Sequence, residues 1–349
     1  MYEYYLKDIE KMEGTNGFNA VSTFSGAGGS CMGLKLAGFN VLWANEFIPA
    51  AQEVYKMNHK NTILDKRDIR TINYKEILNK CNLKQGELDL FEGSPPCAAF
   101  SIAGKGDKCW GKVKKYSDTK QRVDDLFIEY ARLLKGLKPK MFITENVDAL
   151  GHKQNKTYFN TIYSHLANCG YTVKAYILNS MFYNVPQKRK RLFFIGTRND
   201  LNIVPNAPDP NNNIITVKQA IPFYKKYVHE ELNINPKTKA YTLLKYAQRH
   251  KLDNLGTACK KLYNKNSYFT YNICQEHKVS PTLIVGSPLF HEYYPRPVSI
   301  PEAKRLQTFP DDYRLSGTYQ KQWERIARSV PPRMMEALAT KIKQTLEGV

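Results

Sequence analysis

The chain has 349 residues, and its 52 Lys and Arg against 32 Asp and Glu leave a net charge of +20. It contains no uninterrupted apolar run of about 18 residues, so the sequence predicts no membrane-spanning helix. An excess of positive charge this large, interleaved with 23 Tyr, favours a polyanionic partner such as nucleic acid over a merely soluble basic surface.

The cysteines and the N-terminus favour a reducing cytoplasm. Seven scattered cysteines suggest no disulfide framework, and residues 1–5 lack the charged-then-apolar order of a secretion signal. Cys259, Cys274 and His277 come nearest to a metal cluster, but they lack a second pair of ligands. No metal site is therefore expected.

The chain begins as alternating strands and helices around a glycine-rich turn. Residues 18–24 are strand-like, 25–29 (SGAGG) form the turn, and 30–37 are helical. This order can hold a nucleotide-like ligand against backbone amides, although the turn matches neither the dinucleotide nor the phosphate-loop pattern. A second strand at 40–44 ends at Asn45-Glu46, where an acid suits a ribose diol. A solvated carboxylate at a helix start is the equal alternative.

A short strand at 88–92 runs into Ser94-Pro95-Pro96-Cys97. Two prolines fix φ and remove backbone donors, so strand pairing must stop and the turn is stiff. A thiol at a strand's C-terminal end is placed for nucleophilic chemistry, whereas a buried, inert cysteine is the alternative. Residues 98–122 carry seven Lys or Arg against two Asp and lack periodicity, which predicts a long structureless loop over the thiol.

The remaining elements continue the alternation up to residue 198 and then change character. Further strands are predicted at 61–65, 139–145, 171–179 and 191–197, and helices near 48–57 and at 73–80, 124–137 and 156–169, which gives a mostly parallel sheet covered on both faces. We therefore predict a catalytic domain at 1–198, a loop-rich basic domain at 199–297 with a hinge near 199–215, and a returning C-terminal segment at 298–349. That segment has helical patterns at 301–308 and across 319–346.

Three groups predicted at strand ends suit one reaction. Cytosine C5 becomes nucleophilic only after a thiolate adds at C6, and that addition needs a proton or hydrogen bond at N3 and an arginine at O2. Cys97, Glu145 and Arg189 or Arg191 could converge on one such base. The base would have to be flipped out of a duplex, because its reacting carbon is unreachable in the stack.

With these residues identified, the sequence resembles the DNA (cytosine-5)-methyltransferase family over nearly the whole chain except about 215–280. The resemblance rests on eight motifs in the family's order: 24–29 (FSGAGG), Asn45-Glu46, Asp68-Ile69, Pro96-Cys97, Glu145-Asn146-Val147, 187–191 (QKRKR), 296–313 and 326–332. It implies an α/β fold of the class I S-adenosylmethionine-dependent methyltransferases, with a Rossmann-like mixed seven-stranded sheet and a small target-recognition domain.

The resemblance also implies an activity and assigns roles to residues. Cys97 would add to C6 of a flipped cytosine in double-stranded DNA, and the methyl group of S-adenosylmethionine would pass to C5 and leave S-adenosylhomocysteine, without a metal. Catalysis would depend on Cys97, Glu145, Arg189 and Arg191. Cofactor contacts would come from Phe24, Ser25, Gly26, Gly28, Gly29, Asn45, Glu46, Phe47, Asp68, Ile69, Pro96, Leu126, Arg328 and Ser329, and DNA contacts from Ser101, Lys105, Lys108, Arg122 and Gln187.

The chain departs from the family pattern at three places. Ala98 stands where Gln usually follows the nucleophile, and Val123-Asp124-Asp125 replaces an Arg-Gly near the end of the loop. Ala327-Arg328 replaces a Gly-Asn pair, so the Arg328 guanidinium could pair with the carboxylate of the cofactor.

Two other functions compete with DNA methylation. An RNA-acting branch of the same family, which methylates tRNA, also carries Ser-Pro-Pro-Cys, but residues 98–101 and the basic recognition segment favour DNA. A catalytically silent nucleic-acid-binding relative would have no reason to keep Cys97, Glu145 and both arginines. We expect a monomer, because one chain holds every required part, and a cognate restriction endonuclease as partner if the context is restriction–modification.

Overall fold

The computed structural model describes residues 3–96, 114–116, 119–121, 125–221, 230–268 and 271–348. The chain divides into two compact units. Unit 1 comprises Met1–Tyr5, Ser180–Arg189 and Asn211–Pro331, and unit 2 comprises Leu6–Asn179, Lys190–Pro210 and Pro332–Val349. Residues 298–331 thus belong with unit 1, although the sequence analysis grouped 298–349 together. The functional names given to these parts stay predictions.

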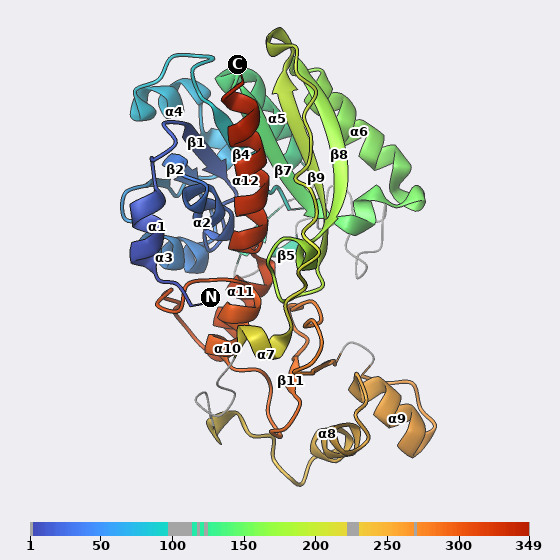
Figure 1. Cartoon of the computed structure of the whole chain (residues 1–349). Coiled ribbons are helices and arrows are strands. Elements are labelled where there is room, and N and C mark those ends of the chain that lie inside the picture. The colour runs from blue at the N-terminus through green and yellow to red at the C-terminus, as the bar shows by residue number, and fades with distance from the viewer. Residues whose placement is uncertain are drawn as a thin grey trace. The chain divides into compact units, whose positions relative to one another are not determined.

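Unit 2 is built on one mixed sheet with helices on both faces (Figure 1). The strand order is β3-β2-β1-β4-β7-β9-β8, with parallel pairing from β3 to β7 and antiparallel pairing of β9 with both of its neighbours. The strands are β1 (Asn19–Thr23), β2 (Asn40–Asn45), β3 (Ile63–Asp65), β4 (Leu90–Gly93), β7 (Met141–Val147), β8 (Tyr171–Asn179) and β9 (Lys190–Arg198). This confirms the predicted mixed seven-stranded sheet.

The antiparallel end of the sheet follows from a short connection. Only Ser180–Arg189 separates β8 from β9, and a parallel partner would require a crossover of about a dozen residues or more. The parallel strands are instead joined through helices. The unit 2 helices are α1 (Leu6–Met12), α2 (Gly29–Leu36), α3 (Pro49–Asn58), α4 (Tyr74–Cys81), α5 (Leu126–Leu137), α6 (Lys156–Ala167) and α12 (Pro332–Leu346).

Apolar side chains fill both sides of the sheet. On one side, α4, α5 and α6 bury a cluster that includes Phe91, Tyr130 and Phe142, with the Phe91 and Tyr130 rings stacked at 4.8 Å. On the other side, α2 is buried along its whole length and packs against α12. Figure 1 shows α12 and α2 on the face opposite α5 and α6.

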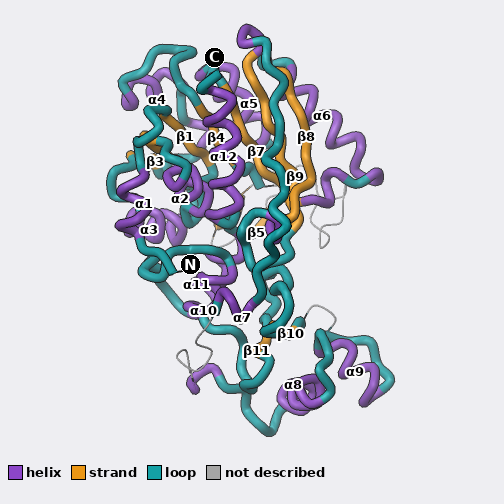
Figure 2. Tube along the Cα trace, viewed as in Figure 1, coloured by secondary structure: helices purple, strands orange, loops and turns teal. Residues whose placement is uncertain are grey.

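Unit 1 has little sheet and consists mainly of loops and short helices (Figure 2). Its elements are α7 (Val217–Ala220), α8 (Lys239–Arg249), α9 (Leu255–Tyr263), β10 (Ile273–Cys274), β11 (Phe290–His291), α10 (Ile300–Leu306) and α11 (Tyr319–Arg328). A small core between α8 and α9 contains Leu243, Leu255 and Cys259. The predicted loop-rich character is correct, but the sequence analysis missed both of these helices.

One other expectation was wrong, and another is refined. The segment 98–122 was predicted to be structureless, yet β5 (Lys114–Tyr116) and β6 (Thr119–Gln121) pair as an antiparallel hairpin. The helical pattern across 319–346 is two helices, α11 and α12, because Pro331 and Pro332 lack the backbone donors that a continuous helix needs. None of the described helices is long and apolar enough to cross a bilayer.

The cysteines within the described ranges are free thiols, and each of them is buried or partly buried. Cys31 is fully buried, and desolvation raises the pKa of its thiol to about 11. Burial likewise raises the pKa of Cys81 to about 11 and that of Cys169 above its ordinary value. Cys259 and Cys274 are buried in unit 1.

The contact between α2 and α12 predicts an unusual response to a glycine replacement. A Cβ on Gly33 would lie 2.5 Å from the Pro332 carbonyl oxygen and 2.5 Å from the Met335 Cβ. Helix propensity alone favours Gly33→Ala by about 1 kcal/mol, but overpacking against a neighbouring backbone costs about 1–3 kcal/mol. Urea unfolding is therefore expected to show a net loss of stability. Gly348→Ala, where a Cβ meets nothing closer than 3.7 Å, is the matched control and should be near neutral.

Candidate active site

The glycine turn follows β1 in a conformation that depends on its glycines. Phe24, Gly26 and Gly28 have φ values of 54°, 56° and 84°, and Gly28 is the N-cap of α2. The Gly28 amide donates to the Ser25 carbonyl at 2.8 Å, which closes the turn. The backbone amides of Gly29 and the residues after it open α2, so this end of the helix favours a polar or anionic ligand group.

The buried side chain of His59 packs against the glycine turn and restricts its shape. A Cβ on Gly28 would lie 2.0 Å from the His59 Nε2, so only glycine fits there. The His59 ring stacks on Tyr55 with centroids 4.1 Å apart. Burial, and then the nearby Lys35 charge, lower the pKa of His59 well below its ordinary value, so the ring is neutral.

Glu46, at the end of β2, ties the glycine turn to α3. Its Oε2 accepts a hydrogen bond from the Gly26 amide at 2.7 Å, and its Oε1 accepts one from the Ile48 amide at 2.7 Å. The side chain is 5% exposed, whereas the neighbouring Phe47 ring is 37% exposed. The predicted acid and the predicted glycine turn are therefore in direct contact.

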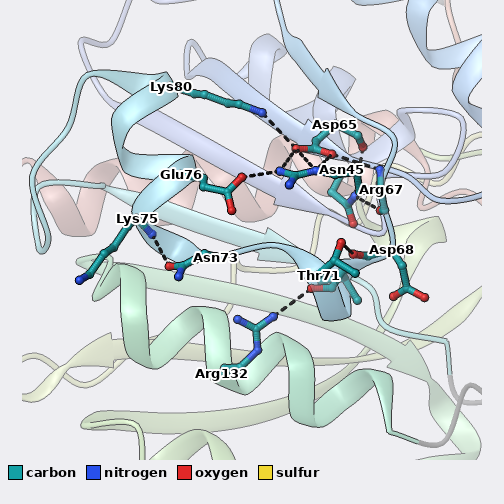
Figure 3. A network of polar contacts seen from close by, with 11 residues as sticks. Asn45, Asp65, Arg67, Asp68, Thr71, Asn73, Lys75, Glu76, Lys80 and Arg132 are labelled. Atoms are coloured by element: carbon teal, nitrogen blue, oxygen red, sulfur yellow. Dashed lines mark hydrogen bonds and ion pairs between the residues drawn. The ribbon is translucent and has the colours of Figure 1, made fainter.

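Asn45 organises the loop after β3, as Figure 3 shows. Its amide nitrogen donates to the Asp65 carbonyl at 3.0 Å and to the Arg67 carbonyl at 2.9 Å. Asp65 in turn accepts from Arg67 and from Lys80, and Arg67 also pairs with Glu76 at 2.7 Å. Asn45 was predicted as a cofactor contact; the described geometry gives its side-chain amide a supporting function in this loop.

Asp68 and Ile69 lie at the end of that loop, beside the start of α5. The Arg70 guanidinium bridges Asp68, at 3.0 Å, and Asp125, at 2.6 Å, the residue before α5. Ile69 and Leu126 are buried in the unit 2 core. Of the predicted cofactor residues in this area, only Asp68 therefore offers a partly exposed polar side chain.

Glu145 and Arg191 meet across the antiparallel pair β7 and β9. The Arg191 Nε lies 2.8 Å from the Glu145 Oε1, and the two side chains are 16% and 15% exposed. Val147 is the register partner of Arg191, which places Glu145 near the end of its strand. Two of the four predicted catalytic groups are thus together and still within reach of solvent.

The other predicted residues are placed differently. Cys97, Ser101, Lys105, Lys108 and Arg122 lie outside the described residues, and Pro96 is the last described residue before the thiol. Arg189 and Gln187 belong to unit 1 and are 2% and 0% exposed.

Gln187 takes part in a chain of hydrogen bonds within unit 1. Its amide nitrogen donates to the Gln307 Oε1 at 2.6 Å, and its Oε1 accepts from the Leu283 amide at 3.3 Å. Gln307 continues this chain by donating to the Ser329 carbonyl at 2.6 Å. The Arg328 Nε donates to Glu324 at 2.7 Å, so the guanidinium predicted to bind the cofactor already has a carboxylate partner within α11.

The sequence analysis missed one polar residue in this area, Glu92 on β4. It is 1% exposed and accepts a hydrogen bond from the Ser22 hydroxyl at 2.6 Å. The only signal in the sequence is an acid within an otherwise apolar predicted strand, directly before the Gly-Ser-Pro-Pro-Cys turn.

Comparison with known proteins now decides the family. The family model for C-5 cytosine-specific DNA methylase matches residues 18–344. The chain belongs to this family. It is a DNA cytosine C5 methyltransferase that uses S-adenosylmethionine.

Individual relatives agree over nearly their whole lengths. The Type II methyltransferase M.FnuDI of Fusobacterium nucleatum is 30% identical, over 93% of this chain and 94% of its own. M.MthTI of Methanothermobacter thermautotrophicus is 29% identical over 94% and 98%. A solved structure of an Escherichia coli prophage protein, described as a DNA modification methyltransferase, shares the fold with a TM-score of 0.70 at 22% identity, over 95% of this chain and 99% of that one.

The geometry of unit 2 fits the cofactor of a C5 methyltransferase. The backbone amides at the start of α2, directly after Gly28, can bind a polar group of the cofactor, and Glu46, which contacts the glycine turn, is followed by the exposed Phe47 ring. A carboxylate and an aromatic face suit the ribose and the adenine of the cofactor. Within the described ranges, no group of three or more His, Cys, Asp or Glu residues is arranged to hold a metal ion.

The Asp65 network predicts a specific pH dependence for this methyltransferase. Burial alone would raise the pKa of Asp65, but hydrogen bonds from Arg67 and Lys80 outweigh it and hold the pKa at about 2. A carboxylate with a lowered pKa stabilises the fold above pH 4, and this contribution is lost as the pH falls towards 2. Asp65→Asn is therefore expected to unfold about 1 kcal/mol more easily at pH 6, since solvent screens the half-exposed partners, and no more easily at pH 2.

Urea unfolding at several pH values measures this difference. Asp209→Asn, at an exposed carboxylate, is the matched control and should follow the wild type throughout. A constant deficit for Asp65→Asn at every pH would contradict the assignment.

Proposed function

We propose that Cys97 is the nucleophile of this methyltransferase and that Glu145 and Arg191 hold the target cytosine while it reacts. The observation that supports this most directly is the Glu145–Arg191 ion pair of 2.8 Å, because it provides an acid and a guanidinium together near strand ends. These are the two groups that a cytosine ring needs at N3 and O2 during addition at C6.

In this mechanism Cys97, Glu145 and Arg191 have separate tasks. The Cys97 thiolate forms a bond to C6 while Glu145 delivers a proton to N3, so the ring electrons move towards C5. S-adenosylmethionine, when bound, supplies the electrophilic methyl group that C5 receives. Water then takes the C5 proton, which re-forms the C5–C6 double bond and breaks the bond between C6 and the Cys97 sulfur, and N3 returns its proton to Glu145. Arg191 keeps Glu145 in place and offers its guanidinium to the ring oxygen.

We also propose that unit 1 reads the DNA sequence. Its helices α8 and α9 expose Lys239, Lys245, Arg249, Lys260 and Lys261 around a small apolar core. Residues 198–297 carry 14 Lys or Arg against seven Asp or Glu. Phosphate contacts by such side chains give an affinity that falls with salt, and other side chains of this unit would then read base edges in the major groove.

The biological context proposed here is a restriction–modification system. The relatives that match over nearly their full lengths are named Type II methyltransferases. A restriction endonuclease that cuts the same sequence would be the partner in function, and the methyltransferase itself would act as a monomer in the cytoplasm.

Removal of the thiol tests the proposed nucleophile. DNA from a methylation-deficient bacterial host that expresses the wild-type protein should carry 5-methylcytosine in one short recurring sequence. Cys97→Ala should abolish this mark because no other group adds to C6, whereas Cys81→Ala should retain it. The readout is a genome-wide map of 5-methylcytosine. Unmodified DNA from folded wild-type protein would contradict DNA methylation, and host tRNA would then be sequenced for the same base.

Removal of the acid tests the role of Glu145. Glu145→Gln keeps the shape of the side chain but cannot give a proton, so the single-turnover rate should fall about 10²- to 10⁴-fold. The affinity for S-adenosylmethionine should change little. Glu53→Gln, at an exposed position on α3, is the control. An unchanged rate for Glu145→Gln would exclude Glu145 as the acid.

A further inference from the structure

Glu92 is a buried carboxyl group at the place where two important turns leave the sheet. It lies on β4, in direct register with Ser22 on β1. The paired register of these two strands ends at Thr23 and Gly93, one residue further along. Beyond that point β1 continues into the glycine turn, and β4 continues into Ser94 and the two prolines before Cys97.

Hydroxyl groups from three segments converge on this carboxyl. The Ser22 hydroxyl donates to Oε2 at 2.6 Å, and the Ser94 hydroxyl donates to Oε1 at 3.3 Å. The hydroxyl of Ser30, in the first turn of α2, also acts on this carboxyl and lowers its pKa. The Ser22 hydroxyl also lies 2.8 Å from that of Ser25 in the glycine turn. One carboxyl group therefore connects both flanks of the glycine turn to the turn before Cys97.

Packing alone does not explain an acid here. Glu92 is 1% exposed, and in the described part of the chain it forms no ion pair. A buried carboxyl without a cation is costly unless hydrogen bonds satisfy it, and an apolar residue would fill the same space without that cost. Desolvation raises the pKa of Glu92 to about 7, although the serine hydroxyls lower it and the Glu145 charge adds to the rise.

We propose that Glu92 is a positioning residue for methyl transfer, which fixes the turn that carries Cys97 relative to the glycine turn that holds the cofactor. This inference rests on the proposed function, since it presumes that Cys97 and the glycine turn act on one base. Transfer requires the methyl group and C5 to come within about 3–3.5 Å in the correct line, and a displacement of 1 Å can cost about 10²-fold. Two turns that extend past the end of their strand pairing need such a connection.

The experiment separates positioning from binding by measuring three quantities on the full-length protein. These are the single-turnover rate of methyl transfer, the dissociation constant for S-adenosylmethionine, and the release of tritium from C5 of cytosine without cofactor, which reports addition of Cys97 alone. Glu92→Leu should lower the transfer rate about 100-fold, while the other two quantities change less than about 5-fold.

Milder variants guard against misfolding of Glu92→Leu. Ser94→Ala cuts only the connection to the turn before Cys97 and should lower transfer about 10-fold, and Ser94→Thr, which keeps the hydroxyl, should restore it. Glu10→Gln, at an exposed carboxylate on α1, is the control for loss of an acid and should match the wild type.

A pH series provides a readout that a purely structural role would not change. Besides the serines, the titratable groups whose charges couple to Glu92 are Cys31 on α2, Tyr130 on α5 and Glu145 on β7. Burial raises the pKa values of Cys31 and Tyr130, so both stay neutral below pH 9. A neutral Glu92→Gln should keep transfer within about 5-fold of the wild type at pH 6, and it should lack the change in rate that ionisation of Glu92 is expected to cause in the wild type around pH 7.

The outcomes are distinct. Equal losses in transfer rate and cofactor affinity would mean that Glu92 only helps to bind the cofactor. Unchanged transfer in Glu92→Leu and Ser94→Ala would mean that Glu92 has no role in transfer. Either result would overturn this inference and leave the proposed function standing. Wild-type protein that binds the cofactor but neither transfers a methyl group nor releases tritium would overturn the proposed function itself.

Discussion

The parallel pairing of β1 with β2 and β4 is the constraint on which the candidate site depends. Parallel strands end at one edge of a sheet, so the residues that follow them must share the space above that edge. Here the residues following β1, β2 and β4 are the glycine turn, Glu46 and the Ser-Pro-Pro turn. Glu145 lies near the end of β7, the next strand in the same parallel set.

Polar groups at this edge are satisfied mainly by one another. Glu46 accepts backbone amides from two segments, Asn45 holds two carbonyl groups, and Glu92 collects serine hydroxyls. Apart from the local bond between Glu46 and the Ile48 amide, these bonds connect one strand end to another, so side chains hold this edge of the sheet together. Such bonds are strong in a buried setting, and a partner left unpaired there is costly. Exchange of a single member should thus disturb several turns.

Much of the unit 2 fold could be predicted because its signals are local. Periodicity found nearly all of its strands and helices, and the range 171–179 agrees with β8 to the residue. The α8 and α9 helices were missed although each has an apolar face that packs in the small core of unit 1, because the sequence analysis interpreted the basic, tyrosine-rich sequence around them as irregular. The hairpin of β5 and β6 consists of two short polar strands, which lack the alternation of apolar and polar residues that predicts strand pairing.

The candidate site was predictable to the extent that its residues stand at element ends. Glu46, Glu145 and Arg191 were predicted in that way, and the structure brings the last two into contact. Glu92 was missed because a buried acid within a strand is recognised only from its neighbours across the sheet, and Ser22 lies seventy positions earlier in the chain. The clash that fixes Gly28 was hidden for the same reason, since His59 comes from beyond α3.

The cysteine thiols that the structure describes are all buried or partly buried. Cys31, Cys81 and Cys169 are held protonated by their surroundings, and Cys259 and Cys274 are shielded in unit 1. Alkylating reagents attack accessible thiolates, so the raised pKa values of the first three thiols and the burial of the other two should make all five react slowly at neutral pH. A thiol that labels much faster than these five would therefore lie outside the described residues.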